Sequence, residues 1–158
     1  MGPSFSPDGE TVLFQRPEAN YIDQPTNFRN QSWGVWAVPV TGGRPELVLR
    51  DAVGARLSPD GRRIVYFKVS PGEDPVAADM WLADADGTDA QRLVRGNLQT
   101  LSAEWSPDGT KIAYARMGGR SGTYVLDVTT GETSKVLDDA YFPEWVDDHT
   151  LIVGPPAQ

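Results

Sequence analysis

Three stretches of the chain carry nearly the same residues: FSPDGETVLFQ at Phe5–Gln15, LSPDGRRIVYF at Leu57–Phe67 and WSPDGTKIAYA at Trp105–Ala115. The shared Ser-Pro-Asp-Gly begins at Ser6, Ser58 and Ser106, so successive copies are 52 and 48 residues apart. A degenerate fourth copy, WVDDHTLIV, begins at Trp145. A repeat of this length with strand-like content is typical of a propeller or a similar array. We therefore interpret the tetrapeptide as a turn that every structural unit needs, and not as a catalytic motif.

The third copy illustrates how one unit is built. Its expected strands are SAEW at 102–105, KIAYAR at 111–116, TYVLDV at 123–128 and TSKVLD at 133–138. In the turn between the first two strands, proline presets φ and glycine accepts the positive φ that follows. The strands are rich in β-branched and aromatic residues, and the TTGE turn before the fourth strand contains glycine. Four antiparallel strands of this kind make one propeller blade.

We predict an all-β fold: a β-propeller with three four-stranded antiparallel blades, at about 1–50, 51–97 and 98–138, and a partial fourth blade at 139–158. No segment repeats apolar residues at helical spacing over about twelve residues, so we expect essentially no long helix. Few residues precede the first turn, which leaves little room for an inner strand in the first blade.

Composition excludes several kinds of partner and site. The 158 residues carry a net charge of −8, which argues against binding to a phosphate backbone, so we expect no nucleic-acid partner. The absence of cysteine excludes disulfides and thiolate metal sites. No apolar run approaches the roughly 18 residues of a membrane span. The first residues, MGPSFSPDGE, lack the basic and apolar leader of a signal peptide.

The repeats resemble those of the TolB-type β-propeller family, which is related in architecture to WD-repeat propellers. The resemblance rests on WSPDGTKIAYAR and GTYVLDVTTGETSKVL in the third unit and on the matching residues of the first two units. Similar repeats occur in periplasmic TolB, in propeller domains of prolyl-oligopeptidase-type peptidases and in some polysaccharide lyases. The resemblance implies the fold and a periplasmic or other extracytoplasmic location, but it does not imply one activity.

TolB-like propellers usually have six blades, whereas this chain holds three units and about half of a fourth. An open arc exposes a blade face at each end, and large apolar faces are usually covered. Three explanations follow: the chain is part of a longer propeller, two chains complete one ring as a homodimer, or the arc docks on another protein.

Two acidic clusters raise the question of metal binding or catalysis. In DADGTD, which begins at Asp84, glycine is the fourth residue and Arg95 the twelfth, whereas a calcium loop has glycine sixth and glutamate twelfth. The single histidine, His149, follows two aspartates in the degenerate turn, and the sequence has no Gly-x-Ser-x-Gly elbow. We therefore predict no catalytic, cofactor-binding or metal-binding residue. Three further carboxylates are expected to be solvated loop groups: Asp138, Asp139 and Glu144.

Aromatic residues recur at equivalent places in the units. Trp36, Trp81 and Tyr124 lie at matching positions of the third strands, and Trp105 and Trp145 end inner strands. Aromatic residues that recur in this way usually pack between blades. We expect them to form the core and not a cofactor site.

The feature that does not repeat is the loop between the second and third strands of the first unit, RPEANYIDQPTNFRNQSW at 16–33. In a propeller, such loops emerge on the same face as the connections from each fourth strand to the next first strand. We call this the loop-rich face. Long loops in compact domains are often functional. The predicted partner-binding residues are Asn20, Tyr21, Phe28, Arg29, Asn30 and Gln31.

These observations predict a non-catalytic module that binds a protein or peptide through its loop-rich face. Two alternatives stay open. The chain could be the propeller portion of a larger enzyme, a prolyl-oligopeptidase-type peptidase or a polysaccharide lyase, with catalytic residues elsewhere. It could also be a half-ring that works only as an assembled oligomer.

Overall fold

The computed structural model describes residues 3–17, 32–69, 78–95, 102–117 and 120–154. They form four antiparallel sheets, and in each sheet the strands are neighbours in chain order. Blade 1 contains β1 (Ser4–Phe5), β2 (Thr11–Pro17), β3 (Trp33–Pro39) and β4 (Glu46–Leu49). Blade 2 contains β5 (Val53–Leu57), β6 (Arg63–Val69), β7 (Ala78–Asp84) and β8 (Gln91–Val94). Blade 3 contains β9 (Ala103–Trp105), β10 (Lys111–Arg116), β11 (Gly122–Asp127) and β12 (Thr133–Asp138). The blade 4 hairpin consists of β13 (Tyr141–Trp145) and β14 (Leu151–Gly154).

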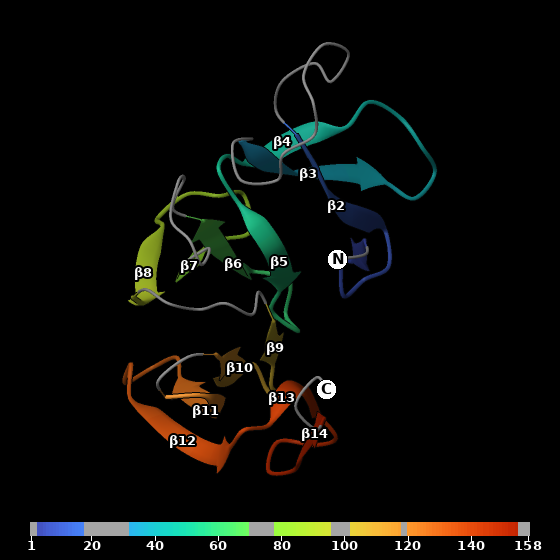
Figure 1. The fold of residues 1–158 in the computed structure, drawn as a ribbon. Helices are drawn as coiled ribbons and strands as arrows, with labels where there is room; N and C mark the ends of the chain where they lie inside the picture. Colours follow the sequence, from blue (N-terminus) through green and yellow to red (C-terminus); the bar gives the residue numbers. More distant parts are fainter. Residues whose placement is uncertain (1–2, 18–31, 70–77, 96–101, 118–119, 155–158) are drawn as a thin grey trace.

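The sheets follow one another around an open arc, with the first strand of each sheet toward the inside (Figure 1). This arrangement confirms the predicted partial propeller of three four-stranded blades and part of a fourth. The described residues contain no helix, and so none that could span a membrane. The inner strand of blade 1 is as short as expected, because β1 has two residues, which pair with Val12 and Leu13.

The Ser-Pro-Asp-Gly turn has the same hydrogen bonds in all three blades. In blade 3, the Ser106 hydroxyl donates to Asp108 Oδ1 at 2.6 Å, and this carboxylate oxygen also accepts from the backbone N–H of Thr110 at 3.0 Å. The N–H of Gly109 donates to the carbonyl of Ser106 at 2.8 Å, and Gly109 has a φ of +70°. Equivalent bonds form around Asp8 and Asp60. Each aspartate therefore closes its own turn, as predicted for a structural motif.

These turns lie side by side on one face of the arc. A Cβ added to Gly109 would lie 3.5 Å from Pro59 Cδ, and one added to Gly61 would lie 3.8 Å from Pro7 Cδ. In each complete blade, one backbone hydrogen bond of 2.9 Å joins the turn between the third and fourth strands to the Ser-Pro-Asp-Gly turn. These bonds are Val40 N–H to Glu10 O, Ala85 N–H to Arg62 O and Val128 N–H to Thr110 O. Both kinds of turn therefore share one face.

The core lies between successive blades. Ile64 and Tyr66 of β6 are 0–1% exposed and pack with residues of blade 1, among them Leu13 and Val35. The equivalent face of blade 3 packs on blade 2 in the same way and contributes Ile112, Tyr114, Tyr124 and Leu126. Burial of such apolar surfaces supplies most of the driving force for folding, so each blade depends on its neighbour.

The aspartates of the turns predict an acid-sensitive fold. The hydrogen bond from Ser106, followed by that from the Thr110 N–H, lowers the pKa of Asp108 from its ordinary 3.8 to about 2. A group with a lowered pKa in the folded state stabilises the protein above its unfolded pKa, and this contribution is lost as the pH falls through the folded pKa. We therefore expect the melting temperature to fall between pH 4 and pH 2.

The Asp108→Asn variant keeps a side-chain oxygen that accepts both bonds but cannot titrate. Its melting temperature should be lower than that of the parent at pH 7 and should fall less steeply between pH 4 and pH 2. Differential scanning calorimetry at several pH values measures both effects. Equal slopes for variant and parent would contradict a role of this carboxylate in acid sensitivity.

Candidate binding surface

The predicted partner-binding loop lies largely outside the residues that the structure describes. Its six residues lie in 18–31, outside the described residues: Asn20, Tyr21, Phe28, Arg29, Asn30 and Gln31. The candidate surface is therefore built from the described residues that lie at the same ends of the strands, opposite the Ser-Pro-Asp-Gly turns.

Phe142 is the most unusual residue at this end of the strands. It is the second residue of β13, which follows the connection from the fourth strand of blade 3. Its φ is +56° and its side chain is 59% exposed. A bulky residue in the left-handed region is strained by about 1–3 kcal/mol. The equivalent residue in blade 2 is Gly54, with a φ of +65°, and both lie in a bulge of the inner strand. The backbone of this bulge favours glycine, yet blade 4 displays an aromatic ring there.

The connection that leads to Phe142 is held by hydrogen bonds from side chains at the start of β11. The Ser121 hydroxyl donates to Asp139 Oδ1 at 2.6 Å, and the buried Thr123 hydroxyl donates to the carbonyl of Ala140 at 2.8 Å. Blade 1 repeats the first bond, from Ser32 to Asp51 at 2.5 Å. Asp139 is an exposed carboxylate between strands, as predicted, and it also anchors this connection. The prediction of loop positions was wrong for Asp138 and Glu144, which lie in β12 and β13. Phe142 is thus presented from an ordered backbone.

Cations lie over aromatic rings in all three complete blades, near the same strand ends. Arg16 lies 3.6 Å from the ring centroid of Trp36, Lys68 lies 4.4 Å from that of Trp81, and Arg116 lies 5.6 Å from that of Tyr124. Such contacts stabilise by about 0.5–1 kcal/mol when exposed. In each complete blade, the aromatic residue of the third strand therefore contacts a cationic side chain near the end of the second strand, in addition to its packing role.

The inner strands align three charged residues along the inside of the arc. Arg56, Glu104 and Glu144 each precede the last residue of their strand, and Arg56 Nε lies 3.6 Å from Glu104 Oε1. Burial, reinforced by the neighbouring Glu144 and opposed by Arg56, raises the pKa of Glu104. The indole N–H of Trp105 donates to the Arg56 carbonyl at 3.1 Å, and that of Trp145 donates to the Glu104 carbonyl at 3.0 Å. These two tryptophans therefore join adjacent blades, in agreement with the predicted packing role.

The acidic clusters of the sequence form turns. Asp147 Oδ1 accepts from the backbone N–H of the exposed His149 at 2.8 Å, and Asp148 Oδ1 accepts from the N–H of Asp108 in the neighbouring blade at 2.8 Å. Asp86 closes the DADGTD turn by accepting from the Thr88 N–H at 3.0 Å. Within the described ranges, no group of three histidine, cysteine, aspartate or glutamate residues is arranged to hold a metal ion.

Comparison with known proteins gives sequence relatives for part of the chain. It is 40% identical over 77 residues to the Tol-Pal system protein TolB of Methylococcus capsulatus, a match that covers 48% of this chain and 18% of the relative. It is 38% identical over 79 residues to the protein of the same name from Coxiella burnetii, with 48% and 18% covered. The matched region is thus less than a fifth of each relative's length. The chain matches no protein-family model.

Solved structures share the fold over most of the chain. The putative TolB of Agrobacterium tumefaciens has a TM-score of 0.65 and 23% identity, with 88% of this chain and 47% of that chain covered. A puromycin hydrolase has a TM-score of 0.68 and 22% identity, with 89% of this chain and 23% of that chain covered. At these identities the structural likeness establishes the propeller fold, and the sequence relatives specify the repeat type. Over about half of its length the chain is therefore similar to TolB proteins, and over most of its length it has the fold of a β-propeller.

Proposed function

We propose that this chain is a non-catalytic module that binds a protein or peptide segment through its loop-rich face. The observation that supports this most is Phe142, which is strained, 59% exposed and located on that face. Strained residues that persist in a fold cluster at functional sites, and exposed aromatic rings are frequent anchors of protein interfaces.

The opposite face offers less for recognition. The Ser and Asp side chains and the Gly backbone N–H groups on this face already bond within the turns, as the contacts around Ser106 and Asp108 illustrate. The loop-rich face instead combines Phe142 with the stacked cations Arg16, Lys68 and Arg116. We include the loop residues Asn20, Tyr21, Phe28, Arg29, Asn30 and Gln31 in the proposed surface.

The relatives supply the setting for this proposal. The matched proteins are named Tol-Pal system proteins, which supports a protein partner for this chain. Resemblance to periplasmic TolB supports a location outside the cytoplasm. The likeness to a puromycin hydrolase favours the second candidate, in which the chain is the propeller portion of a larger enzyme. Association of two copies into a ring is a third arrangement, and it leaves the loop-rich face available.

The Phe142→Gly variant tests the binding surface. Glycine suits the positive φ, so the free energy of unfolding should stay within about 1 kcal/mol of the parent or rise above it. Peptides selected from a displayed library on the full chain should bind this variant at least tenfold more weakly, as measured by fluorescence titration.

A matched control is Phe5→Ala, because Phe5 is also exposed, at 67%, but lies next to the Ser-Pro-Asp-Gly turn. Its affinity for the selected peptides should equal that of the parent. Equal affinity of the Phe142→Gly variant and the parent for every selected peptide would contradict the proposed surface.

A further inference from the structure

Three cationic side chains of the loop-rich face contact aromatic rings but pair with no carboxylate. Arg16, Lys68 and Arg116 each occupy one of the last two positions of a second strand, one in each complete blade. Within the part of the chain that the structure describes, none of the three forms an ion pair. Their positive charges are therefore not compensated by a direct partner.

The strand registers place no carboxylate opposite the two arginines. Arg16 pairs with Gly34 of β3, and Arg116 pairs with Gly122 of β11. Residues directly opposite each other in an antiparallel pair are the nearest side-chain neighbours, and glycine has no side chain to offer. A guanidinium that stacks on a ring also keeps its N–H groups at its edges, in the fork that binds a carboxylate through two hydrogen bonds. Each arginine can therefore accept an acidic group from outside the chain.

Lys68 does have a carboxylate opposite it, that of Asp79 in β7, but this group pairs with another cation. Asp79 Oδ2 lies 3.2 Å from Arg92 Nη1 of β8. Lys68 and Tyr66 are two residues apart, so they share one face of β6, and Tyr66 packs against blade 1. The Lys68 ammonium therefore lies on the side of blade 2 that faces blade 1, 4.4 Å from the ring centroid of Trp81.

The described carboxylates near this end of the strands are each bonded to another side chain of the fold. Two of them accept from serine hydroxyls, and two pair with a lysine or an arginine. The carboxylates are those of Asp51, Asp79, Asp138 and Asp139, and their partners are Ser32, Arg92, Lys135 and Ser121, respectively. These acidic groups therefore serve the fold, whereas the three cations remain available to a ligand.

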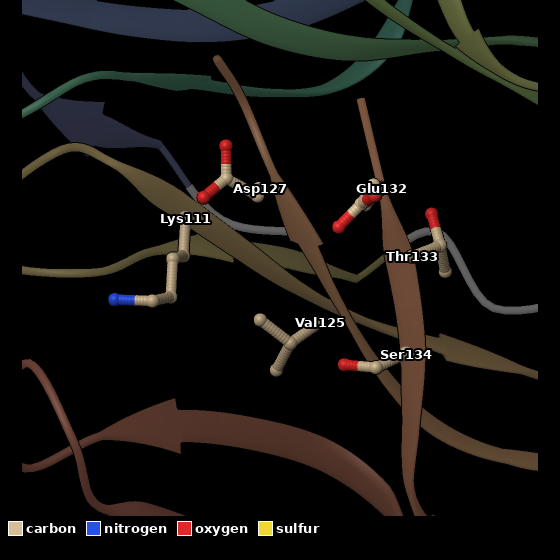
Figure 2. A pocket seen from close by; sticks show the side chains of 6 residues that line it. All are labelled: Lys111, Val125, Asp127, Glu132, Thr133 and Ser134. Carbon is tan, nitrogen blue, oxygen red and sulfur yellow. The ribbon is translucent and has the colours of Figure 1, made fainter. Parts of the chain in front are cut away.

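The opposite end of the same strands is arranged differently. Lys111, the first residue of β10, pairs in register with Asp127 of β11. Figure 2 shows both side chains at a pocket of about 460 Å³, which Glu132 also lines. In blade 2, Arg63 pairs in register with Asp84. A carboxylate thus lies opposite the cation at the Ser-Pro-Asp-Gly end, whereas glycine or an already paired aspartate lies opposite it at the loop-rich end.

We propose that the segment bound by the loop-rich face is an acidic peptide whose Asp and Glu side chains pair with Arg16, Lys68 and Arg116. This acidic character rests on the proposed function and adds the chemistry of the partner. The cations are distributed one to a blade, so carboxylates at separate points of one extended peptide reach successive blades. The ring beside each cation excludes water from one side, which strengthens a charge-assisted hydrogen bond on the other.

The charge of the whole chain favours a short acidic peptide over a long polyanion. With a net charge of −8, the chain repels nucleic acid at long range, and three cations are few for a continuous phosphate backbone. A peptide with a few carboxylates needs only the local charges that the loop-rich face provides.

The test uses peptides selected from a displayed library on the full chain at about 150 mM NaCl. The selected peptides should be enriched in Asp and Glu. Synthetic counterparts in which Asn and Gln replace every Asp and Glu should bind about tenfold more weakly or worse, as measured by fluorescence titration. The affinity of the acidic peptides should also fall as the salt concentration rises, because salt screens exposed charge pairs.

A variant that combines Arg16→Gln, Lys68→Gln and Arg116→Gln should lose about tenfold or more in affinity for the acidic peptides and most of the salt dependence. Its melting temperature verifies that it folds. If it does not fold, Arg16→Gln alone, at an exposed position, should show part of both losses. Arg62→Gln is the matched control, because Arg62 is exposed but lies at the Ser-Pro-Asp-Gly end, and its affinity should equal that of the parent.

Selected peptides without an excess of carboxylates, or acidic peptides whose affinity the glutamine variants leave intact, overturn the acidic partner. The proposed function is judged separately by Phe142→Gly: it stands if this variant still weakens the selected peptides, and it fails if the variant has no effect. A thymidine oligonucleotide that binds as tightly as the peptides, and is lost with the same cations, also overturns the acidic peptide, because the loop-rich face then recognises phosphate.

Discussion

Replacing Trp105 by alanine is expected to lower the free energy of unfolding by about 3–5 kcal/mol, the range measured for truncation of large buried aromatic residues. The side chain is 8% exposed, packs in the cluster between blades 2 and 3, and donates to the Arg56 carbonyl at 3.1 Å. The guanidinium of Arg63 also lies 5.3 Å from its ring centroid. Truncation leaves a cavity and an unpaired carbonyl at the contact between two blades.

Two further variants make this expectation specific. Trp105→Phe keeps most of the apolar contact and should cost about half as much. Trp145→Ala removes the same indole bond from the blade 4 hairpin, where the ring is only half-buried, and should cost about 1–2 kcal/mol. Urea unfolding followed by circular dichroism measures all three. Equal costs for Trp105→Ala and Trp145→Ala would contradict the argument that the deeper burial of Trp105 makes its truncation more costly.

The repeated elements of this fold could be predicted from sequence because their causes are local. The Ser-Pro-Asp-Gly turn, its positive-φ glycine and the strand after it are specified by neighbouring residues, and the predicted 111–116 and 133–138 strands coincide with β10 and β12. Consecutive antiparallel strands place the turn after the first strand and the turn after the third strand at the same end of the sheet, so the face that these turns share could be predicted from strand order. A pattern that recurs three times also reveals which residues serve the repeat.

Contacts between distant residues were harder to foresee. Ser121 and Asp139 are 18 residues apart, and neither belongs to the motif that first reveals the repeat. The cation over each third-strand aromatic residue depends on the cross-strand register, which a single strand does not specify. An alignment of DAVGARL at 51–57 with DAYFPEW at 139–145 gives Phe142 the position that Gly54 has in blade 2. A bulky residue aligned with a glycine was the available signal for its strained backbone.

The proposed site differs from the repeated elements, because its residues do not follow the repeat. Phe142 and the loop at 16–33 both depart from the pattern of the other units, and such departures are expected at functional sites. The loops of the sequence predict a binding surface on the loop-rich face, and Phe142 is the described residue that we add to this proposed surface. The identity of the ligand depends on side chains that no repeat constrains.

Gly122 gives the second large expected effect, since an alanine there should lower the free energy of unfolding by about 3 kcal/mol or more. Its φ is +140°, a region that side chains rarely adopt, and this strain costs about 1–3 kcal/mol. An added Cβ would also lie 2.2 Å from the carbonyl oxygen of Leu137, so β11 and β12 would have to separate. Overpacking of this kind typically costs another 1–3 kcal/mol.

Gly131→Ala is the matched control for this prediction. Gly131 also has a positive φ, +73°, but nothing lies within 4 Å of an added Cβ, so only the backbone strain of about 1 kcal/mol applies. Urea unfolding gives the two free energies, and hydrogen exchange locates the change, because loss of protection in the Gly122→Ala variant should concentrate in β12. All six residues of β12 are exposed, and none belongs to the core cluster between blades 2 and 3. The strand can therefore separate from β11 without disturbing that core. Equal costs for the two alanines would mean that β12 moves aside freely, and the close approach of Gly122 to Leu137 would then contribute nothing to the stability of blade 3.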